Sequence, residues 1–356
     1  MYCVIMAGGK GSRFWPRSRA ALPKQLLDIV SDRTLIQQTV ERIAGLVPAG
    51  RILIVTGREQ AGAIYQQLPE IPRENILIEP VGRNTAPCIC LAALWVEKKE
   101  PGATMAVLPA DHYIGIPQAF CRCLESAIEA AGQLDALVTI GITPRSPETG
   151  YGYIQCGKET GTHKGQAAYQ VQQFHEKPSL EKAREFLAQG NFLWNSGMFI
   201  WRAATILAEI KTCLPEMYGT LAEVAPHLGT AQAQQAIDAA YQKIEGISID
   251  YGVMEKSSRV AILKGDFGWS DVGSWSAIYD ISEKDAQGNV MHGDVIAVDA
   301  RGSLVYSPKK LTAIVGLDNV VIVETADALL VCARDKSQDV KKVVDILEQR
   351  GKKEYL

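Results

Sequence analysis

The sequence contains no feature that would tie the chain to a membrane or a nucleic acid. None of its 356 residues belongs to an apolar run long enough for a transmembrane helix. The first residues, MYCVIMAGGKG, carry no basic segment before their short apolar run, so no signal peptide is predicted. Lysine and arginine (37) do not exceed aspartate and glutamate (40), and the net charge is −3. We therefore expect no nucleic-acid or membrane partner, and any anionic ligand must be held by local cations.

The eight cysteines lack the spacing of a metal site. Two C-x-C pairs occur, Cys88 with Cys90 and Cys121 with Cys123, in stretches that have helical patterns. Neither pair has a histidine or a second cysteine pair at the separation of zinc ligands. The cysteines are interpreted as buried free thiols in a reducing compartment, and a cytoplasmic location is expected.

Compact apolar runs alternate with helical patterns over the first 140 residues. Strands are expected at Tyr2–Ala7, Arg51–Thr56, Asn75–Glu79, Thr104–Leu108 and Ala136–Ile140, with helices between them. Continuous apolar strands separated by helices predict an α/β fold with a mixed, mostly parallel sheet that is covered on both faces. Ligands of such sheets bind beyond the carboxyl ends of the strands. The glycines after the first strand, Glu79 and Asp111 all fall there.

The rest of the chain divides into a mixed segment and a β-rich one. Between Thr149 and Ser276, short strands such as Gly152–Gln155 and Met198–Trp201 alternate with helices, as insertions that close over the site. Beyond residue 285, short apolar runs follow one another at intervals of about ten residues, split by Asp, Gly, Asn and Pro. They predict a small β-helix-like module that ends in an amphipathic helix. The expected domains are residues 1–285 and 286–356.

A glycine loop, Gly8–Arg13, directly follows the first strand. Its glycines allow a sharp turn and a close approach to a ligand, and successive free N–H groups form an anion-binding nest. The loop is not a P-loop, because Lys10 is followed by Gly11 rather than Ser or Thr. Nor is it a dinucleotide fingerprint, which would need glycine in place of Phe14. A plain tight turn remains the alternative.

Four cations lie close to this loop, namely Arg13, Arg17, Arg19 and Lys24. Cations beside a phosphate-sized nest suit a triphosphate. A solvated basic loop is the alternative, and it fits Arg17 and Arg19 better than the other two.

The segment Gly8–Lys24, GGKGSRFWPRSRAALPK, resembles the signature of the sugar-nucleotide pyrophosphorylases, G-G-x-G-[ST]-R-[LF]-x-P followed by a proline-lysine pair. The W-P-x-S-R variant within it is similar to the mannose-1-phosphate guanylyltransferase branch, in its short monofunctional form. Phe14 and Arg17 stand where leucine is commoner, and neither change removes a chemical group that the loop needs. The resemblance spans nearly the whole chain and extends to Glu79–Pro87, Phe174–Pro178, Trp194–Phe199, Ile249–Glu255 and Gly268–Trp275.

The resemblance implies a Rossmann-like nucleotide-diphospho-sugar transferase domain followed by a left-handed β-helix-like module. It also implies a magnesium ion held by Asp111 and Asp271. Asp111 ends a strand near the expected phosphate site, where a carboxylate is a natural Mg²⁺ ligand, although by itself it would more often be a cap or turn residue. The neighbouring His112 is expected to make a structural hydrogen bond rather than to bind metal.

The substrate residues are also carried over from the resemblance. Nucleotide binding is expected from Gly8, Gly9, Gly11, Ser12, Arg13, Lys24, Glu79, Asn84, Thr85, Pro109 and Asp111. Sugar binding is expected from Gly152, Glu176, Lys177, Asn195 and Gly197, while Asp250 and Glu255 are expected to be largely structural. A carboxylate or amide suits the N1–H and N2–H₂ donors of guanine. Asn84 or Thr85 capping the helix near Ala86 is the simpler alternative.

The implied reaction is transfer of GMP from GTP to mannose 1-phosphate, which gives GDP-mannose and pyrophosphate. The expected catalytic residues are Arg13, Lys24, Asp111, Lys177 and Asp271, with Mg²⁺ as cofactor. No general base is required, because the sugar phosphate is already an anion at neutral pH.

Three other functions compete with this interpretation. The same chemistry with another nucleotide or hexose 1-phosphate is the nearest, and a non-catalytic regulatory subunit is the second. A nicotinamide-dependent dehydrogenase is disfavoured by the glycine spacing. Some relatives carry an added isomerase domain, and since the chain ends at Leu356 no phosphomannose isomerase activity is expected. A homodimer is expected through the β-rich module.

Overall fold

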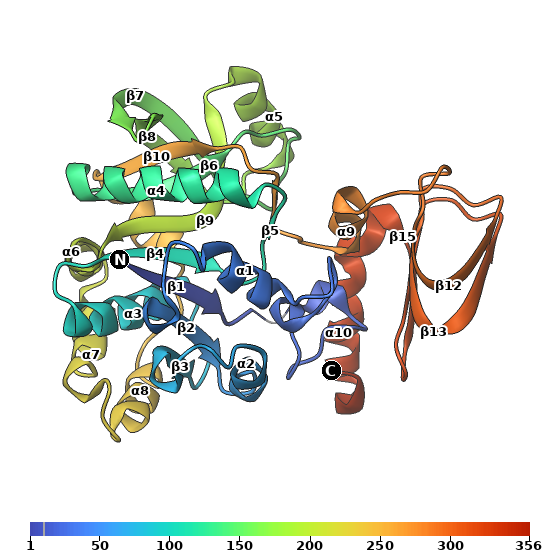
Figure 1. Cartoon of the computed structure of the whole chain (residues 1–356), viewed down its shortest axis with the longest axis horizontal. Helices are drawn as coiled ribbons and strands as arrows, with labels where there is room; N and C mark the ends of the chain where they lie inside the picture. The colour runs from blue at the N-terminus through green and yellow to red at the C-terminus, as the bar shows by residue number, and fades with distance from the viewer. Residues whose placement is uncertain (10) are drawn as a thin grey trace.

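Two sheets organise the chain, one in a large α/β region and one in a smaller C-terminal module (Figure 1). The structure, a computed structural model, describes residues 1–9 and 11–356. Lys10, which belongs to the predicted glycine loop, lies outside the described residues. Within the described ranges, no helix combines the length and the apolar character that crossing a bilayer requires.

The large sheet has nine strands in the order β3-β2-β1-β4-β9-β6-β10-β8-β7. All of them except β8 and β9 run in the same direction. This confirms the predicted α/β fold with a mixed, mostly parallel sheet. The strands are β1 (Tyr2–Ala7), β2 (Ile52–Gly57), β3 (Ile76–Glu79), β4 (Thr104–Pro109), β6 (Leu137–Ile142), β7 (Tyr153–His163), β8 (Gln166–His175), β9 (Phe192–Arg202) and β10 (Val260–Gly265).

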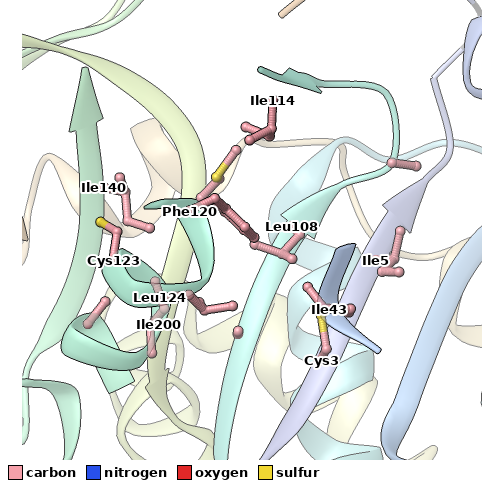
Figure 2. Packing of buried hydrophobic residues seen from close by; sticks show 14 of the residues in the cluster. Cys3, Ile5, Ile43, Leu108, Ile114, Phe120, Cys123, Leu124, Ile140 and Ile200 are labelled. Carbon is pink, nitrogen blue, oxygen red and sulfur yellow. The ribbon is translucent and has the colours of Figure 1, made fainter. Parts of the chain in front are cut away.

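Helices cover both faces of this sheet. They are α1 (Leu35–Ile43), α2 (Ala61–Gln67), α3 (Thr85–Lys99), α4 (Pro117–Leu134), α5 (Leu180–Gln189), α6 (Ala203–Cys213), α7 (Pro215–Ala222) and α8 (Ala233–Tyr241). Because side chains alternate along a strand, Cys3 and Ile5 of β1 pack with α1 and α4, whereas Tyr2 and Val4 pack with α3 and α6. Figure 2 shows Phe120 of α4 among the apolar side chains of the first face. Burial on both faces explains why these strands are continuously apolar.

The elements predicted for the first 140 residues are confirmed to within a few residues at their ends. Both C-x-C pairs lie in helices, as expected, in α3 and α4, and all eight cysteines are free. The segment after residue 149 was predicted less well. The two short strands expected there overlap the 11-residue strands β7 and β9, and β8 was not predicted. Much of the β7–β8 hairpin is exposed and polar, so its outer half has no apolar signal to detect.

A third sheet, with two strands, joins distant parts of the chain. It pairs β5 (Tyr113–Ile114) with β11 (Trp269–Ser270) in antiparallel register, with Ser270 opposite Tyr113. Asp111 comes just before β5 and Asp271 just after β11. The pairing therefore brings the two predicted metal ligands to the same end of this small sheet.

The C-terminal module contains β12 (Val290–Val298), β13 (Leu304–Val315), β14 (Val320–Glu324) and β15 (Leu329–Ala333). β12, β13 and β14 are parallel neighbours, and β15 returns antiparallel to β14. Consecutive parallel strands without intervening helices confirm the predicted β-helix-like module. The predicted terminal helix is α10 (Val340–Gln349).

The module shares a core with the segment that follows β1. Phe14 and Trp15 are buried together with Trp275 of α9 (Trp275–Ile281) and with residues of β13, β14 and α10. The Trp15 indole N–H donates to the Tyr355 carbonyl oxygen at 2.9 Å. In Figure 1 the red helix α10 stands between the blue N-terminal part and the orange strands β12 and β13. The boundary between residues 285 and 286 stays a prediction, since this core spans both sides of it.

A substitution at Gly293 tests whether the bend of β12 requires glycine, at the point where the register with β13 shifts. Its φ is 101°, and a Cβ atom there would lie 1.9 Å from the Ser307 carbonyl oxygen. We expect Gly293→Ala to lower the free energy of unfolding by more than about 2 kcal/mol, measured by urea denaturation. Gly316→Ala is the matched control, because φ is 64° but no atom lies within 4 Å, so it should cost only about 1 kcal/mol. Equal losses would contradict this explanation.

Candidate active site

A cleft of about 500 Å³ opens at the carboxyl ends of β1, β3 and β4. This is the position predicted for the ligand site of an α/β sheet. The structure brings together most of the predicted site residues along its walls: Gly8, Gly9, Glu79, Asn84, Thr85, Pro109, Asp111, Gly152, Glu176, Lys177, Asn195, Gly197 and Asp271.

The remaining predicted residues lie near the cleft but do not line it. Ser12 faces a neighbouring hollow of about 800 Å³, which shares Gly8 and Glu79 with the cleft. Gly11 adjoins the backbone of Lys24. Arg13 is exposed, and in the part of the chain that the structure describes its side chain makes no hydrogen bond or ion pair.

The other two cations of the loop are engaged elsewhere. Arg17 forms an ion pair with Asp28 at 2.5 Å and stacks over the ring of Tyr306. Arg19 forms an ion pair with Asp327 of the C-terminal module at 3.0 Å. These two arginines therefore bind the loop to neighbouring segments and do not face the cleft. Of the four cations, Arg13 and Lys24 would remain for a triphosphate.

Lys24 lies buried between the two predicted metal ligands. Its ammonium is 2.7 Å from Asp111 Oδ2 and donates to the carbonyl oxygens of Asp271, at 2.7 Å, and Val272, at 3.1 Å. These contacts match its three N–H donors. Burial opposes ionisation of Asp111, but the charge of Lys24, the charge of His112 at the low pH where that ring is protonated, and the hydrogen bond from Lys24 outweigh it, so the Asp111 pKa is lowered. Asp111 is thus an anion at neutral pH.

Asp271 is held by a tyrosine and by strained backbone. The Tyr151 hydroxyl donates to Asp271 Oδ1 at 2.7 Å. Val272 has a φ of 48°, which is unfavourable for a β-branched residue. Asn84 and Lys177, on the cleft wall, also have positive φ values of 68° and 47°. Such strain persists only where the surrounding structure enforces it, and it is concentrated at functional sites.

The two carboxylates fit a magnesium ion. Asp111 Oδ1 and Asp271 Oδ2 remain free of the Lys24 and Tyr151 contacts, and both side chains line the same cleft. Mg²⁺ is commonly bound by one or two carboxylates together with phosphate oxygens and water. Among the described residues, no cluster of three or more His, Cys, Asp or Glu side chains offers an all-protein metal site. The donor set therefore suits an ion that is shared with a phosphate ligand.

His112 makes the structural hydrogen bond that was predicted. Its Nδ1 accepts from the Trp269 indole N–H at 3.1 Å, and the two rings meet edge to face. Burial lowers the His112 pKa to about 4, so the ring is neutral at physiological pH. This bond ties the end of β4 to β11 and so supports the geometry of Asp111 and Asp271.

The predicted sugar residues also line the cleft. A Cβ atom on Gly152 would lie 2.5 Å from Glu176 Oε2, so a larger residue there would displace this carboxylate. Asn195 donates from Nδ2 to Asp250 Oδ1 at 2.8 Å, and Asp250 itself lines the cleft. Burial and the charge of Glu176 raise the Asp250 pKa to about 6. Lys177 is exposed, 3.1 Å from Glu176.

The residues predicted to bind near the base, Glu79, Asn84 and Thr85, also line the cleft. Glu79 is buried, its Oε1 accepts from the Tyr241 hydroxyl at 2.8 Å, and burial raises its pKa to about 7. Asn84 is the N-cap of α3, with Oδ1 accepting from the Thr85 N–H at 2.9 Å. Thr85 Oγ1 accepts from the Ile249 N–H. The capping role is therefore present, and Asn84 still lines the cleft.

Sequence reasoning did not give three of these residues a role in the cleft. Asp250 and Trp269 line the cleft and lie within recognised motifs. Their place in those motifs was the one indication in the sequence that they lie near the site. Tyr241 lies in a helix without a motif, and no sequence pattern marks it. Its contact with Glu79 links positions 162 residues apart and depends on the tertiary fold.

Comparison with known proteins identifies the family of the chain. The nucleotidyl transferase family matches residues 2–288, and a MannoseP isomerase/GMP-like beta-helix domain matches residues 293–347. A mannose-1-phosphate guanylyltransferase of Escherichia coli is 41% identical over 367 residues, which cover 99% of this chain and 75% of that protein. The alginate biosynthesis protein AlgA of Pseudomonas aeruginosa is 41% identical over 362 residues, 99% of this chain and 73% of that one.

A solved structure is similar over the whole chain. It is described as a mannose-1-phosphate geranyltransferase from Thermus thermophilus, with a TM-score of 0.88 and 36% identity, covering 98% of this chain and 99% of that one. The chain belongs to the nucleotidyl transferase family, in the branch of the mannose-1-phosphate guanylyltransferases.

The raised pKa of Glu79 predicts a pH-dependent cost in stability. Between pH 4.5 and about 7 the unfolded chain has released this proton while the folded protein keeps it, so rising pH favours unfolding. We expect Glu79→Gln to gain stability relative to the wild type between pH 4.5 and about pH 8, by on the order of 3 kcal/mol.

Urea unfolding of the wild type and of Glu79→Gln at pH 4.5 and at about pH 8 measures this gain in stability. The exposed Glu74 provides the control, because Glu74→Gln should change stability equally at both. A Glu79→Gln difference that does not vary with pH would show that Glu79 carries no such cost.

Proposed function

We propose that the protein transfers GMP from GTP to mannose 1-phosphate, giving GDP-mannose and pyrophosphate. One observation carries the proposal: Asp111 and Asp271, which the buried Lys24 joins, line one cleft together with the residues expected to bind the base and the sugar. The names of the relatives at 41% identity support the choice of guanine and mannose.

The reaction needs positioning more than acid–base chemistry. A phosphate oxygen of the sugar phosphate attacks the α-phosphorus of GTP, and the bond to the β-phosphate bridging oxygen breaks. The nucleophile is already an anion, so no residue has to remove a proton. The difficulty is to bring several negative phosphates together, and catalysis then consists of orientation and charge neutralisation.

The sugar substrate would be held by the residues around Glu176. The carboxylate of Glu176 and the amide of Asn195 would bind sugar hydroxyls, with Gly152 and Gly197 leaving room for the ring. The Asn195 amide is oriented for this by its bond to Asp250. Lys177, exposed at the rim, would anchor the sugar phosphate.

The nucleotide would be held by the glycine loop and the β3 end. Backbone N–H groups of Gly8, Gly9, Gly11 and Ser12 would face its phosphates. Arg13 and Lys24 would stabilise the leaving pyrophosphate. Asp111 and Asp271 would hold Mg²⁺, which when bound neutralises phosphate charge.

Other parts of the interpretation stay predictions. The proposed homodimer would form through the C-terminal module, where exposed apolar side chains lie on β12, β13 and β15: Met291, Ile296, Val298, Leu311, Val315, Leu329 and Val331. The cytoplasmic location and the division into two domains are proposed on the sequence evidence. The regulatory-subunit alternative is weakened by the presence of Lys24, Asp111 and Asp271 in one cluster.

A substitution of Lys24 tests its proposed role in catalysis. We expect Lys24→Ala to lower kcat by about 100-fold, because single preorganised charge contacts contribute on the order of 3 kcal/mol to transition-state stabilisation. Steady-state kinetics of pyrophosphate release measure the effect, with Lys284→Ala as the control, since Lys284 is exposed and bonds to carbonyl oxygens near α9. A loss below about tenfold would remove Lys24 from its proposed role.

Substrate choice tests the reaction itself. Pyrophosphate release should be fastest with GTP and mannose 1-phosphate when GTP, ATP, UTP and dTTP are crossed with mannose 1-phosphate and glucose 1-phosphate. Chelation of divalent cations should abolish it, and added Mg²⁺ should restore it. Preference for another pair would overturn the guanine and mannose assignments, whereas no turnover with any pair would favour the regulatory subunit.

A further inference from the structure

The two oxygens of the Glu79 carboxylate have different surroundings. Oε1 accepts a hydrogen bond from the Tyr241 hydroxyl at 2.8 Å. Oε2 faces Gly8, where a Cβ atom would lie 3.4 Å away. The side chains of Glu79 and Tyr241 are both buried, yet Glu79 lines the cleft. One side of the carboxylate is thus tied to the protein interior, and the other is turned toward the glycine loop.

Tyr241 is itself rigidly placed. It is the last residue of α8, and its ring is fully buried in the core cluster beneath α3. Near the other end of α8, Gln234 donates from Nε2 to the Ile78 carbonyl oxygen at 3.1 Å. The residue before Glu79 is therefore bound to the same helix that carries Tyr241. These contacts couple the position of the hydroxyl to that of the carboxylate.

The segment after Glu79 is fastened to the end of the same helix. Arg83 donates from Nε to the Tyr241 carbonyl oxygen at 3.2 Å. Backbone bonds join the Ile247 N–H to the Arg83 carbonyl and the Ala86 N–H to the Ile247 carbonyl. The segment from Glu79 to the start of α3 is thus supported along its length by α8 and the loop that follows it.

A carboxylate can recognise guanine only in a particular plane. Guanine presents its N1–H and N2–H₂ donors side by side, and two carboxylate oxygens match them when the group is ionised and correctly oriented. A buried carboxylate without a donor of its own would favour the neutral form and rotate more freely. The Tyr241 hydroxyl uses one lone pair of Oε1, which leaves the others available.

We propose that Tyr241 is a positioning residue for nucleotide selection, whose hydroxyl fixes the plane of the Glu79 carboxylate against the guanine edge. The inference deepens the proposed function and depends on it. Tyr241 touches no reacting atom, so its removal changes which nucleotide is selected more than it changes the chemical step.

The test compares GTP with ITP, which lacks the N2 amino group, in Tyr241→Phe and the wild type. Phenylalanine keeps the buried ring and removes only the hydroxyl. We expect kcat/KM for GTP to fall about tenfold, mostly through KM, and kcat/KM for ITP to fall less. The preference for GTP over ITP therefore narrows several-fold. Tyr65→Phe, a tyrosine of α2 remote from the cleft, should keep the wild-type preference.

A double-mutant cycle separates positioning from a purely structural role. In a Glu79→Gln background the guanine carboxylate is gone, and Tyr241→Phe should then leave the GTP to ITP preference unchanged. If Tyr241→Phe lowers thermal stability but leaves the preference of the wild-type background within twofold, the tyrosine only satisfies a buried carboxylate and the inference is wrong. Tyr241→Met, which also lacks the hydroxyl and packs flexibly, provides the same test should the phenylalanine variant not fold.

The same experiment distinguishes failure of the inference from failure of the proposed function. Wild-type protein that does not use GTP with mannose 1-phosphate would overturn the proposed function and, with it, this inference. Wild-type protein that prefers GTP over ITP, together with an unchanged preference in Tyr241→Phe, would overturn the role of Tyr241 alone.

Discussion

The arrangement of the cleft depends on the contacts of one buried group, the ammonium of Lys24. It joins three segments that are remote in sequence: the loop after β1, the end of β4 through Asp111, and the turn after β11 through the carbonyls of Asp271 and Val272. A buried cation is costly unless all its donors are satisfied, and here the partners are one carboxylate and two carbonyl oxygens. The strained backbone at Val272 is consistent with this demand, because its carbonyl is turned toward the cation.

The shared core behind the loop gives that contact a rigid base. Phe14 and Trp15 are packed by α9, α10 and the C-terminal strands, while Arg19 is paired with Asp327. The β-helix-like module therefore helps to support the loop that follows β1. This explains why Arg17 and Arg19 lie in the basic segment and yet do not face the cleft.

Two carboxyl groups that line the cleft are held in the same way. Glu79 and Asp250 are carboxyl groups whose pKa values are raised by burial, to about 7 and about 6, and each accepts a hydrogen bond from a neutral side chain, Tyr241 or Asn195. Such groups reduce folding stability near neutral pH, but they are oriented and accessible to a ligand that supplies further donors. Selectivity and stability are therefore in opposition at these positions.

The sequence by itself determined the α/β core, the C-terminal β-rich module and most of the cleft. Continuous apolar strands such as β1 and the helical spacing in α1 reflect burial, which is a local pattern with a definite period. The motifs around Asp111, Glu176 and Asp271 were found in another way, by their resemblance to the sugar-nucleotide pyrophosphorylases. Only the tertiary structure decided the partners: the pairing of β5 with β11 that brings Asp111 beside Asp271, the ion pairs of Arg17 and Arg19, and the approach of Tyr241 to Glu79. These contacts join residues far apart in the chain, and no periodicity records which distant side chain a polar group will meet.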